Sequence, residues 1–314
     1  MHSVVFGGAG FIGHHLILSL LAAGKSVICV DSLKSGSALN LKNFTANDNF
    51  KFYQLDISDT DSLLKVVPSN SVIYHLASNP DIAAAASNPR IDFVNGTIIT
   101  ESALEVARLT SAAHFIYTSG SGVYREDYDN ELNESAQLLP ISTYGASKLA
   151  GESLAAAYSF MFSLKVTILR FANVVGPFQT HGVGYDLLRK LKANQESLDI
   201  RGDGTQEKAY VHVSDVVRAI DVIVSKQVNQ YDIYNVSLNQ TVTVKEIVEM
   251  CLQQSGISES DIALSYQSSP RGWIGDVPKI RMNSEKLRSL GWTPRYSCQE
   301  ALKDSLGAMW TEIS

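Results

Sequence analysis

The stretch Gly7-Gly8-Ala9-Gly10-Phe11-Ile12-Gly13 decides the fold of this 314-residue chain. It follows an apolar run typical of a buried β-strand and opens a run typical of a helix. Gly8, Gly10 and Gly13 satisfy the pattern GxGxxG, and Gly7, Gly10 and Gly13 satisfy the related GxxGxxG. Glycines permit a tight turn and let backbone N–H groups approach a pyrophosphate at the positive end of a helix. A strand, this loop and a helix in that order predict a dinucleotide-binding site, with a plain glycine-rich turn as the alternative.

Carboxylates follow the next two predicted strands. Asp31 ends the second strand, where its oxygens can accept hydrogen bonds from both ribose hydroxyls and its charge would repel a 2′-phosphate. This favours NAD over NADP, although Lys34 lies nearby. Asp56 and Ile57 follow the third strand, where the carboxylate can meet the adenine amino group and the apolar side chain can cover the ring. A helix N-cap is the alternative for Asp56.

The first half of the chain alternates short β-rich runs with helical patterns. The expected strands cover residues 3–6, 26–30, 50–55, 71–75, 114–118 and 165–170, and the expected helices cover 11–23, 59–66, 92–108 and a stretch from about Tyr144. Strands that alternate with helices are joined by right-handed crossovers and form a parallel sheet covered on both faces. The sequence therefore predicts an α/β, Rossmann-type doubly wound parallel sheet.

The pattern becomes less regular after Asn173, where glycine-rich loop signals are frequent. Residues 231–236 predict one more strand, followed by a helix from Val244, whereas residues 255–281 are loop-rich. We expect two lobes with a cleft between them. The expected bounds are 1–174 for the NAD-binding domain, to which 212–238 return, and 175–211 and 239–314 for a smaller, discontinuous C-terminal substrate lobe.

The composition is that of a folded globular protein, with 45% hydrophobic and 18% charged residues. A net charge of −6 gives no basic surface for nucleic acid or an anionic membrane, so we expect neither partner. The apolar run 11–23 is short, contains His14 and His15 and lacks a basic leader. A core helix explains it better than a targeting or membrane segment, and we expect a cytoplasmic protein.

The three cysteines, Cys29, Cys251 and Cys298, form neither a CxxC pair nor a Cys/His metal pattern. Their odd number and wide spacing argue against a disulfide framework. Cys29 lies within an apolar run and is predicted to be a buried core thiol. The sequence thus predicts neither a metal site nor a disulfide.

Tyr144 and Lys148 stand four residues apart at the start of a predicted helix, so they share one helix face. An ammonium beside a phenol favours the phenolate, which lowers the phenol pKa from about 10 toward neutral pH. Such a phenolate can take a proton when a hydroxyl is oxidised to a ketone and return it on reduction. Chance Tyr-xxx-Lys matches are common, so the pair gains its weight from the nucleotide loop upstream.

Several short motifs occur together along the chain. They are the glycine loop, Asp31, His75-Leu76-Ala77, Gly96-Thr97, Val123-Tyr124, the Tyr144–Lys148 pair and Gly291-Trp292-Thr293-Pro294. Over essentially its full length the chain resembles an extended short-chain dehydrogenase/reductase and, within that superfamily, the NAD-dependent nucleotide-sugar epimerase/dehydratase family. The resemblance implies tightly held NAD, a UDP- or dTDP-sugar substrate, and a homodimer formed through two helices that start near Asp92 and Tyr144.

The loop, the strand ends and this resemblance together give the candidate cofactor contacts. They are Gly7, Gly10, Phe11, Ile12, Gly13, Asp31, Ser32, Asp56, Ile57, Leu76, Ala77, Ser78, Ser119, Tyr144, Lys148 and Phe171. By resemblance, Tyr144 is the catalytic acid/base, and Lys148 lowers its pKa and holds the nicotinamide ribose. His75 is expected to be buried and hydrogen-bonded rather than catalytic.

The third catalytic residue of the family is missing or displaced. Relatives carry Ser or Thr three residues before the Val-Tyr pair, and that position is Gly120 here. We expect Ser121 to bind the sugar 4-oxygen instead. Ser119, a backbone group or water are alternatives, and both serines could merely satisfy loop amides. Family dehydratases have Asp-Glu just before the Val, and decarboxylating relatives commonly Glu, where this chain has Ser121-Gly122.

The candidate substrate contacts are Ser121, Asn173, His181, Lys208 and Arg271. By resemblance, Asn173 lies near the sugar phosphates, and Lys208 stands where relatives have a diphosphate-binding arginine. Arg271 belongs to an Arg…Gly-Asp signature, and His181 lies on the loop over the sugar. A turn residue is the alternative for Asn173, and a solvated surface arginine for Arg271. Phe178 stands where relatives often have another arginine.

Without a carboxylate for elimination chemistry, this pattern favours 4-epimerisation. The sequence predicts an NAD-dependent nucleotide-sugar 4-epimerase that acts by transient C4 oxidation and re-reduction. The expected substrate is UDP-glucose, UDP-glucuronate or a UDP-N-acetylhexosamine. The first alternative is an NAD-dependent 4-ketoreductase of NDP-deoxysugar biosynthesis, and the second is an NAD-binding protein without turnover.

Overall fold

The chain divides into two compact units, each assembled from separate segments. The computed structural model describes residues 1–126, 130–226 and 229–313. Unit 1 comprises Met1–Val123, Thr143–Arg170 and Ala219–Tyr234. Unit 2 comprises Tyr124–Ser142, Phe171–Arg218 and Asn235–Ser314.

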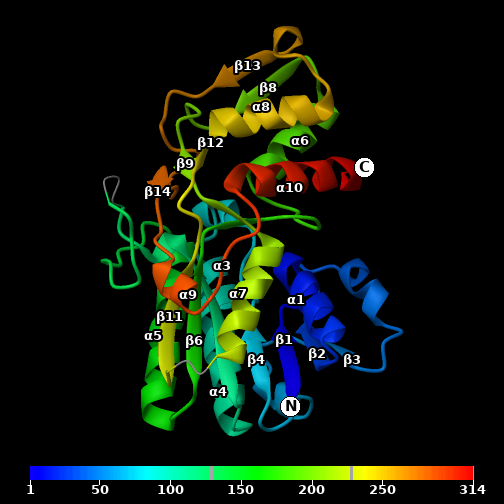
Figure 1. Ribbon diagram of the computed structural model, residues 1–314, viewed down its shortest axis with the longest axis vertical. Helices are drawn as coiled ribbons and strands as arrows, with labels where there is room; N and C mark the ends of the chain where they lie inside the picture. Colours follow the sequence, from blue (N-terminus) through cyan, green and yellow to red (C-terminus); the bar gives the residue numbers. More distant parts are fainter. Residues whose placement is uncertain (127–129, 227–228, 314) are drawn as a thin grey trace. The chain divides into compact units, whose positions relative to one another are not determined.

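Unit 1 is built on a seven-stranded sheet with the strand order β11-β6-β5-β4-β1-β2-β3 (Figure 1). The strands are β1 (His2–Phe6), β2 (Ser26–Asp31), β3 (Phe50–Gln54), β4 (Val72–His75), β5 (His114–Gly120), β6 (Val166–Phe171) and β11 (Tyr231–Val236). The pairs β1–β2, β1–β4, β2–β3 and β4–β5 are parallel. The seven predicted strands and the predicted fold class are therefore confirmed. The order reverses at β1, and open α/β sheets bind ligands at the carboxyl edge of such a switch point.

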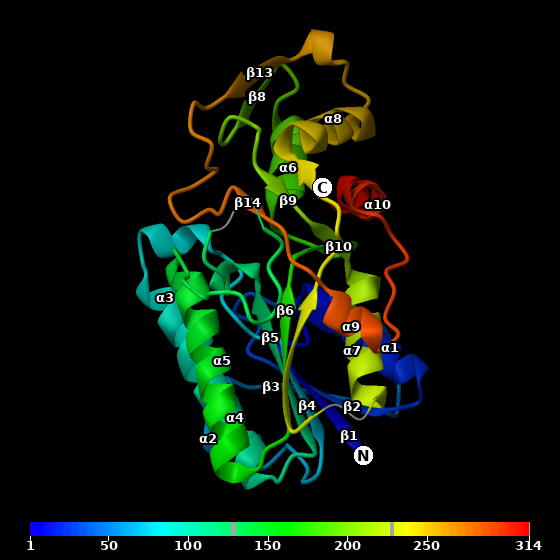
Figure 2. The same cartoon turned by 60° about the vertical axis from the view of Figure 1, so that its left-hand side comes forward.

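Helices cover both faces of this sheet. Figure 2 shows α1 (Phe11–Ala22) on one face and α4 (Ile99–Leu109) and α5 (Thr143–Phe162) on the other. The shorter α2 (Thr60–Leu64) packs against α4. A doubly covered sheet explains why its strands read as continuous apolar runs in the sequence.

The predicted helical stretch 92–108 is confirmed, but it contains an irregular segment. A short helix α3 (Arg90–Asp92) leads into a π-helical segment, Phe93–Ile98, before α4 begins. This segment packs tightly on α5, because a Cβ added to Gly96 would lie only 2.0 Å from the Ser147 Oγ. The irregular π-helical segment therefore coincides with a tight tertiary contact between Gly96 and α5.

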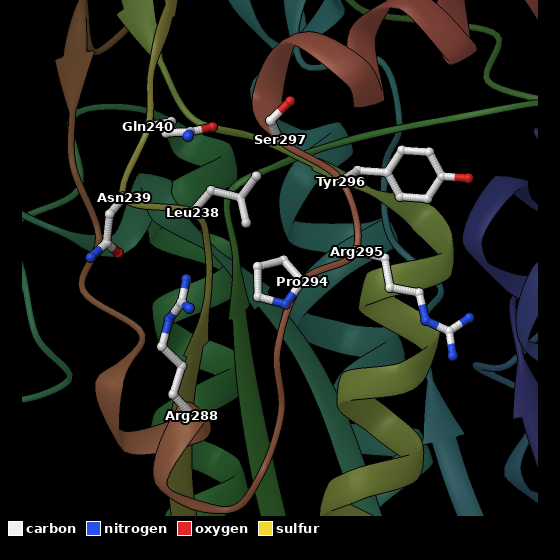
Figure 3. A pocket seen from close by; sticks show the side chains of 8 residues that line it. All are labelled: Leu238, Asn239, Gln240, Arg288, Pro294, Arg295, Tyr296 and Ser297. Carbon is white, nitrogen blue, oxygen red and sulfur yellow. The ribbon is translucent and has the colours of Figure 1, made fainter.

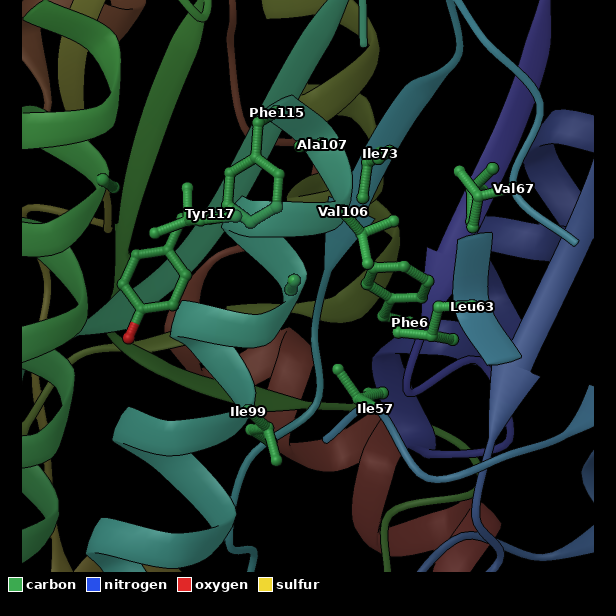
Figure 4. Packing of buried hydrophobic residues seen from close by; sticks show 14 of the residues in the cluster. Phe6, Ile57, Leu63, Val67, Ile73, Ile99, Val106, Ala107, Phe115 and Tyr117 are labelled. Atoms are coloured by element: carbon green, nitrogen blue, oxygen red, sulfur yellow. The ribbon is translucent and has the colours of Figure 1, made fainter. Parts of the chain in front are cut away.

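The core of unit 1 lies between the sheet and α4 (Figure 4). Phe6, Ile73 and Phe115, from β1, β4 and β5, pack in one cluster with Val106 of α4, and all four side chains are fully buried. Full burial of such a side chain stabilises the fold by roughly 1.5–3 kcal/mol. Cys29 is also fully buried, which confirms the prediction of a core thiol.

The apolar run 11–23 forms the core helix α1. Leu16, Ile17 and Leu20 are buried, and the His14 ring lies 2.6 Å from the carbonyl oxygen of Asn40. The prediction of a core helix is confirmed. Within the described residues, no helix is both long enough and apolar enough to cross a membrane.

Unit 2 contains three small sheets packed with helices. Their strand orders are β10-β7, β12-β9-β14 and β13-β8. The elements are β7 (Asn173–Val175), α6 (Val183–Ala193), β8 (Ser197–Ile200), β9 (Glu207–Lys208), β10 (Tyr210–His212), β12 (Val242–Thr243), α8 (Val244–Ser255), β13 (Ala263–Tyr266), β14 (Lys279–Ile280), α9 (Glu285–Ser289) and α10 (Cys298–Glu312). The predicted helix from Val244 is confirmed, and a capping box of Thr243 and Glu246 fixes its start. Helix α7 (Val213–Ser225) contains residues of both units.

Candidate active site

The glycine loop leaves β1 with the geometry that a dinucleotide requires. Gly7 has φ of +81°, and a Cβ there would lie 2.7 Å from the backbone nitrogen of Ala77. No side chain caps α1 at Gly10, and its first turn carries no acidic residue. The first backbone N–H groups of α1, those of Phe11, Ile12 and Gly13, are therefore free of side-chain caps and suited to an anion.

Asp31 links the end of β2 to this loop. Its carboxylate is 7% exposed and accepts hydrogen bonds from the backbone N–H groups of Ala9 at 3.0 Å and Leu33 at 2.8 Å. Burial raises the pKa of Asp31, and the two backbone hydrogen bonds oppose that rise. Each carboxylate oxygen has two lone pairs, so both can still accept a ribose hydroxyl. The neighbouring Ser32 is half-buried.

Asp56 forms an ion pair with Lys34, with 2.6 Å between Nζ and Oδ2. The hydrogen bond from Lys34 lowers the pKa of Asp56 to about 2, and bonds from Ser58 act in the same direction. Asp56 does not cap α2, because Asp59 is the N-cap residue there. The N-cap alternative was therefore wrong. Lys34, which weakened the predicted preference for NAD over NADP, is paired with this carboxylate.

Tyr144 and Lys148 lie in the first two turns of α5, with the Lys148 Nζ 5.7 Å from the centre of the Tyr144 ring. Lys148 is 5% exposed, and its Nζ donates a hydrogen bond to the carbonyl oxygen of Thr118 at 2.8 Å. The same ammonium lies 5.4 Å from the centre of the Tyr117 ring. The structure therefore brings the two predicted catalytic residues together beside the end of β5.

The ionisation of this pair differs from the prediction. Burial raises the pKa of Tyr144; a hydrogen bond with Ser78 lowers it, and the Asp92 carboxylate raises it further. Burial lowers the pKa of Lys148 to about 8, and Glu152 opposes that change. The sequence predicted a Tyr144 pKa lowered by Lys148, whereas in the structure this pKa is raised and burial is the largest cause.

Ser119 and Ser121 flank Gly120 at the end of β5. Ser119 is 4% exposed, and within the described residues its hydroxyl has no hydrogen-bond partner. Ser121 begins a half-buried 3-10 turn, Ser121–Val123. The loop-amide alternative is therefore wrong for Ser119. A buried hydroxyl without a partner costs roughly 1–3 kcal/mol, so this group is suited to a ligand.

His75 confirms its predicted structural role. The ring is fully buried, and its Nε2 lies 3.0 Å from the Thr100 hydroxyl. Burial lowers the pKa of His75 to about 3, so the ring is neutral near pH 7. It stacks on Tyr117, with 5.9 Å between ring centres.

Asp92 fixes the start of α5, and the sequence motifs did not single it out as a site residue. It is 1% exposed, and its two oxygens accept hydrogen bonds from the Asn79 amide at 2.8 Å and the Thr143 hydroxyl at 2.7 Å. Ser147 donates to its backbone carbonyl at 2.8 Å. Asp92 therefore holds the turn that presents Tyr144. The signal available in the sequence was the position of Asp92, four residues before Gly96-Thr97.

Lys208 and Arg271 in unit 2 are both paired with carboxylates. Lys208 forms an ion pair with Asp276, whose second oxygen accepts the backbone N–H of Gly272 at 3.1 Å. Arg271 makes two hydrogen bonds to Glu126, at 2.5 and 2.9 Å, and a third to the carbonyl oxygen of Asp276 at 2.5 Å. The alternative of a solvated surface arginine was therefore wrong. Asp276 links the two predicted diphosphate ligands.

Asn173 begins strand β7 and is not a turn residue. Its backbone N–H and its side-chain amide both donate to the carbonyl oxygen of Ala209, at 3.2 and 3.3 Å. Ala209 follows Lys208, the last residue of β9, and precedes β10, which pairs with β7. Phe171, the last residue of β6, is buried, and His181 is exposed on the loop before α6.

Two hollows in unit 2 contain none of the candidate contacts. The first, of about 330 Å³, is lined by Leu238, Asn239, Gln240, Arg288, Pro294, Arg295, Tyr296 and Ser297 (Figure 3). Arg288 extends toward Asn239, whereas Arg295 points away from Arg288. The second, also of about 330 Å³, is lined by Lys190, Asp199, Ile200, Arg201, Ser265 and Gln267.

A doubly wound sheet, a glycine loop that fits a dinucleotide and the Tyr144–Lys148 pair on α5 define the chain as an extended short-chain dehydrogenase/reductase. More narrowly, the chain belongs to the NAD dependent epimerase/dehydratase family, whose model matches residues 3–237. NAD is its cofactor, and the open α1 terminus, Asp31 and the unpartnered Ser119 hydroxyl all fit it.

Proteins similar to this chain carry out more than one reaction. Human dTDP-D-glucose 4,6-dehydratase is 30% identical over 319 residues, which cover 96% of this chain and 88% of the relative. The structure of UDP-glucose 4-epimerase from Thermotoga maritima with UDP-glucose has a TM-score of 0.88 and 30% identity, with complete coverage of both chains. UDP-glucuronic acid 4-epimerase from Bacillus cereus, in complex with UDP-glucuronic acid and NAD, has a TM-score of 0.89 and 26% identity, and covers 99% of this chain and 100% of its own.

Proposed function

We propose that the protein is a nucleotide-sugar 4-epimerase. The observation that carries the proposal is the turn after β5, where Ser121-Gly122 supplies no carboxylate beside the Tyr144–Lys148 pair. Elimination of water across C5 and C6 needs an acid and a base at those carbons. The carboxylate that acts on Tyr144, Asp92, is 1% exposed and accepts hydrogen bonds from Asn79 and Thr143, which hold it at the start of α5. Oxidation at C4 followed by re-reduction needs none of these extra groups.

Tyr144 moves the proton in this mechanism. Its phenolate accepts the proton of the sugar 4-hydroxyl as the C–H hydride leaves, and its phenol returns a proton to the 4-oxygen when the hydride comes back. The glycine loop and Asp31 would hold NAD, which would supply the acceptor and donor of the hydride. Lys148 keeps a positive charge beside Tyr144, and Ser121 donates a hydrogen bond to the 4-oxygen. Inversion follows when the ketone presents its other face to the returning hydride.

A UDP-sugar is the proposed substrate, with UDP-glucose, UDP-glucuronate and UDP-N-acetylhexosamines as candidates. The ligands bound in the similar epimerase structures, UDP-glucose and UDP-glucuronic acid, support this class. In unit 2, Arg271, Lys208 and Asn173 are proposed to bind the diphosphate and His181 to contribute to sugar specificity. Cofactor binding is proposed for unit 1.

Incubation of the purified protein with UDP- and dTDP-sugars, without added cofactor, tests the reaction. NMR of the anomeric and H4 signals should show inversion at C4 with no loss of water or carbon dioxide. A steady requirement for added NADH would instead identify the 4-ketoreductase, which needs the same Tyr144 and Lys148. NAD binding without turnover of any sugar nucleotide would contradict both enzymes.

We also propose a homodimer formed through α4 and α5. The observation that supports it is the exposed apolar end of α5, where Phe160 is 75% and Met161 72% exposed. Exposed apolar patches often mark interfaces between proteins. Light scattering should give twice the chain mass, and Phe160→Glu combined with Met161→Glu should give the monomer. A wild-type monomer at micromolar concentration would exclude the dimer.

A further inference from the structure

Unit 1 contains a buried ion pair that the proposed mechanism does not use. The Arg170 Nε and Nη2 donate to the two carboxylate oxygens of Glu152, at 2.9 and 2.7 Å. The side chains are 1% and 4% exposed, so neither charge is hydrated. Arg170 lies on β6 and Glu152 on α5, so the pair ties the helix to the sheet. Buried pairs of this kind are often no more stabilising than apolar side chains of the same size, so stability alone does not account for this pair.

Glu152 stands four residues after Lys148 on α5, and both are buried. Positions i and i+4 lie one above the other on a helix face. The Glu152 carboxylate is therefore a charged group that lies on α5 one helical turn after Lys148. It acts on Lys148 electrostatically and favours the protonated form, against the loss of solvation.

Before NAD and substrate bind, the other described groups that face Lys148 carry no charge near neutral pH. Tyr117 on β5 lies under the ammonium, and burial raises its pKa. His75 on β4 has its pKa lowered to about 3 by burial and by Lys148. Tyr144 on α5 also has its pKa raised by burial. Of the titratable groups described around Lys148, Glu152 therefore supplies the negative charge, and Arg170 is its partner.

We propose that Glu152 and Arg170 are positioning residues that set the protonation state of Lys148. Glu152 supplies the counter-charge that keeps the buried ammonium protonated, and Arg170 fixes that carboxylate and partly neutralises it. This inference rests on the proposed catalytic role of Lys148. It makes opposite predictions for the two partners: loss of Glu152 leaves two buried cations and expels the Lys148 proton, whereas loss of Arg170 leaves Glu152 to hold that proton more strongly. A pair that only ties α5 to β6 would not change the titration of Lys148.

Direct titration of Lys148 tests the inference without any turnover. In protein labelled with 13C at lysine Cε, the signal that disappears in Lys148→Arg belongs to Lys148, and its chemical shift is followed against pH. Glu152→Gln should lower the midpoint by about one pH unit or more, and Arg170→Met should raise it. Unmoved midpoints, or midpoints that move in the same direction in both variants, would overturn the inference.

The double variant Glu152→Gln/Arg170→Met guards against misfolding, because it removes both members of the buried ion pair together. It should lower the midpoint by less than Glu152→Gln alone; an unchanged midpoint would also overturn the inference. Glu105→Gln is the matched control, since Glu105 forms a similar two-bond pair with Arg108 on α4, away from Lys148. It should leave the Lys148 titration unchanged.

Activity measured on the same variants separates this inference from the proposed function. The alkaline limb of kcat/KM should move with the NMR midpoint, down in Glu152→Gln and up in Arg170→Met. Shifted midpoints in a protein that epimerises no sugar nucleotide would uphold the inference and refute the function. Epimerisation with unshifted midpoints would do the reverse.

Discussion

Two ion pairs of the same chemistry have different environments in the two units. Glu152–Arg170 in unit 1 and Glu126–Arg271 in unit 2 each join a carboxylate to a guanidinium through two hydrogen bonds. The side-chain exposures are 4% and 1% in the first pair, and 22% and 33% in the second. Water cannot replace a lost partner in the first pair, but it can in the second. Hydrogen-bond geometry alone therefore does not show whether an ion pair can exchange its partner. The burial of its side chains does show this.

This difference suggests different roles in the proposed reaction. A buried pair beside Lys148 can tune a proton, since electrostatic effects are strong where solvent is absent. A half-exposed pair can exchange its carboxylate for an anionic ligand, since the released Glu126 is hydrated at once. We therefore expect substitutions in unit 1 to act on kcat and stability, and those in unit 2 to act on KM.

The largest expected effect is that of Tyr144→Phe. Removal of the hydroxyl that moves the proton should lower kcat about 10³-fold while KM changes little. Steady-state epimerisation measured by NMR gives both constants. Tyr158→Phe is the control on the same helix, because its hydroxyl bonds Glu105 and lies away from Lys148; its kcat should equal that of the wild type. Activity retained in Tyr144→Phe would contradict the mechanism.

The two ion pairs should differ sharply in their contribution to stability. Glu152→Gln should lower the free energy of unfolding by about 3–5 kcal/mol, because it removes the carboxylate that pairs with a buried guanidinium. Glu126→Gln should lower it by no more than about 1 kcal/mol, because water solvates the released arginine. Urea unfolding followed by circular dichroism measures both. Equal losses would mean that burial does not distinguish the pairs.

The fold could be predicted from the sequence because its strands are local patterns. Each strand of the sheet is a separate apolar run, and the glycine pattern from Gly7 to Gly13 indicates a strand followed by a tight turn and a helix. The irregular Phe93–Ile98 segment could not be predicted, because the contact between Gly96 and Ser147 joins residues far apart in the sequence. The short strands of unit 2 carry too few residues to show a period.

The candidate site was predictable in its residue types and not in its electrostatics. Spacing alone placed Tyr144 and Lys148 on one face of a helix, as the structure shows. It could not show that burial would raise the Tyr144 pKa, because burial depends on packing against β5 and Asp92. Nor could it show which carboxylate would meet Arg170, a charge inside an apolar strand. The roles of the candidate contacts stay predictions.

Arg271→Gln should weaken substrate binding and spare the chemistry. Charge-assisted hydrogen bonds to a diphosphate are worth about 1.5–3 kcal/mol, so KM should rise about 10-fold or more at an unchanged kcat. The KM of Arg271→Lys should lie between those of the wild type and Arg271→Gln, because lysine keeps the charge but loses the bidentate hydrogen-bonding geometry. Isothermal titration with UDP measures the binding term directly. A fall in kcat with unchanged KM would place Arg271 in the chemical step instead.

Glu126→Gln should give the smallest effect and the opposite sign. If a diphosphate displaces Glu126 from Arg271, loss of the competing carboxylate charge should strengthen UDP binding about 2- to 5-fold, the range expected for a partly exposed ion pair. Glu126→Asp, which keeps the charge, is the matched control and should not strengthen binding. A higher salt concentration should reduce the difference in UDP affinity between Glu126→Gln and the wild type, because exposed charges are screened. Weaker UDP binding in Glu126→Gln would show instead that Glu126 holds Arg271 in its binding position, and the half-exposed pair would then act as permanently as the buried one.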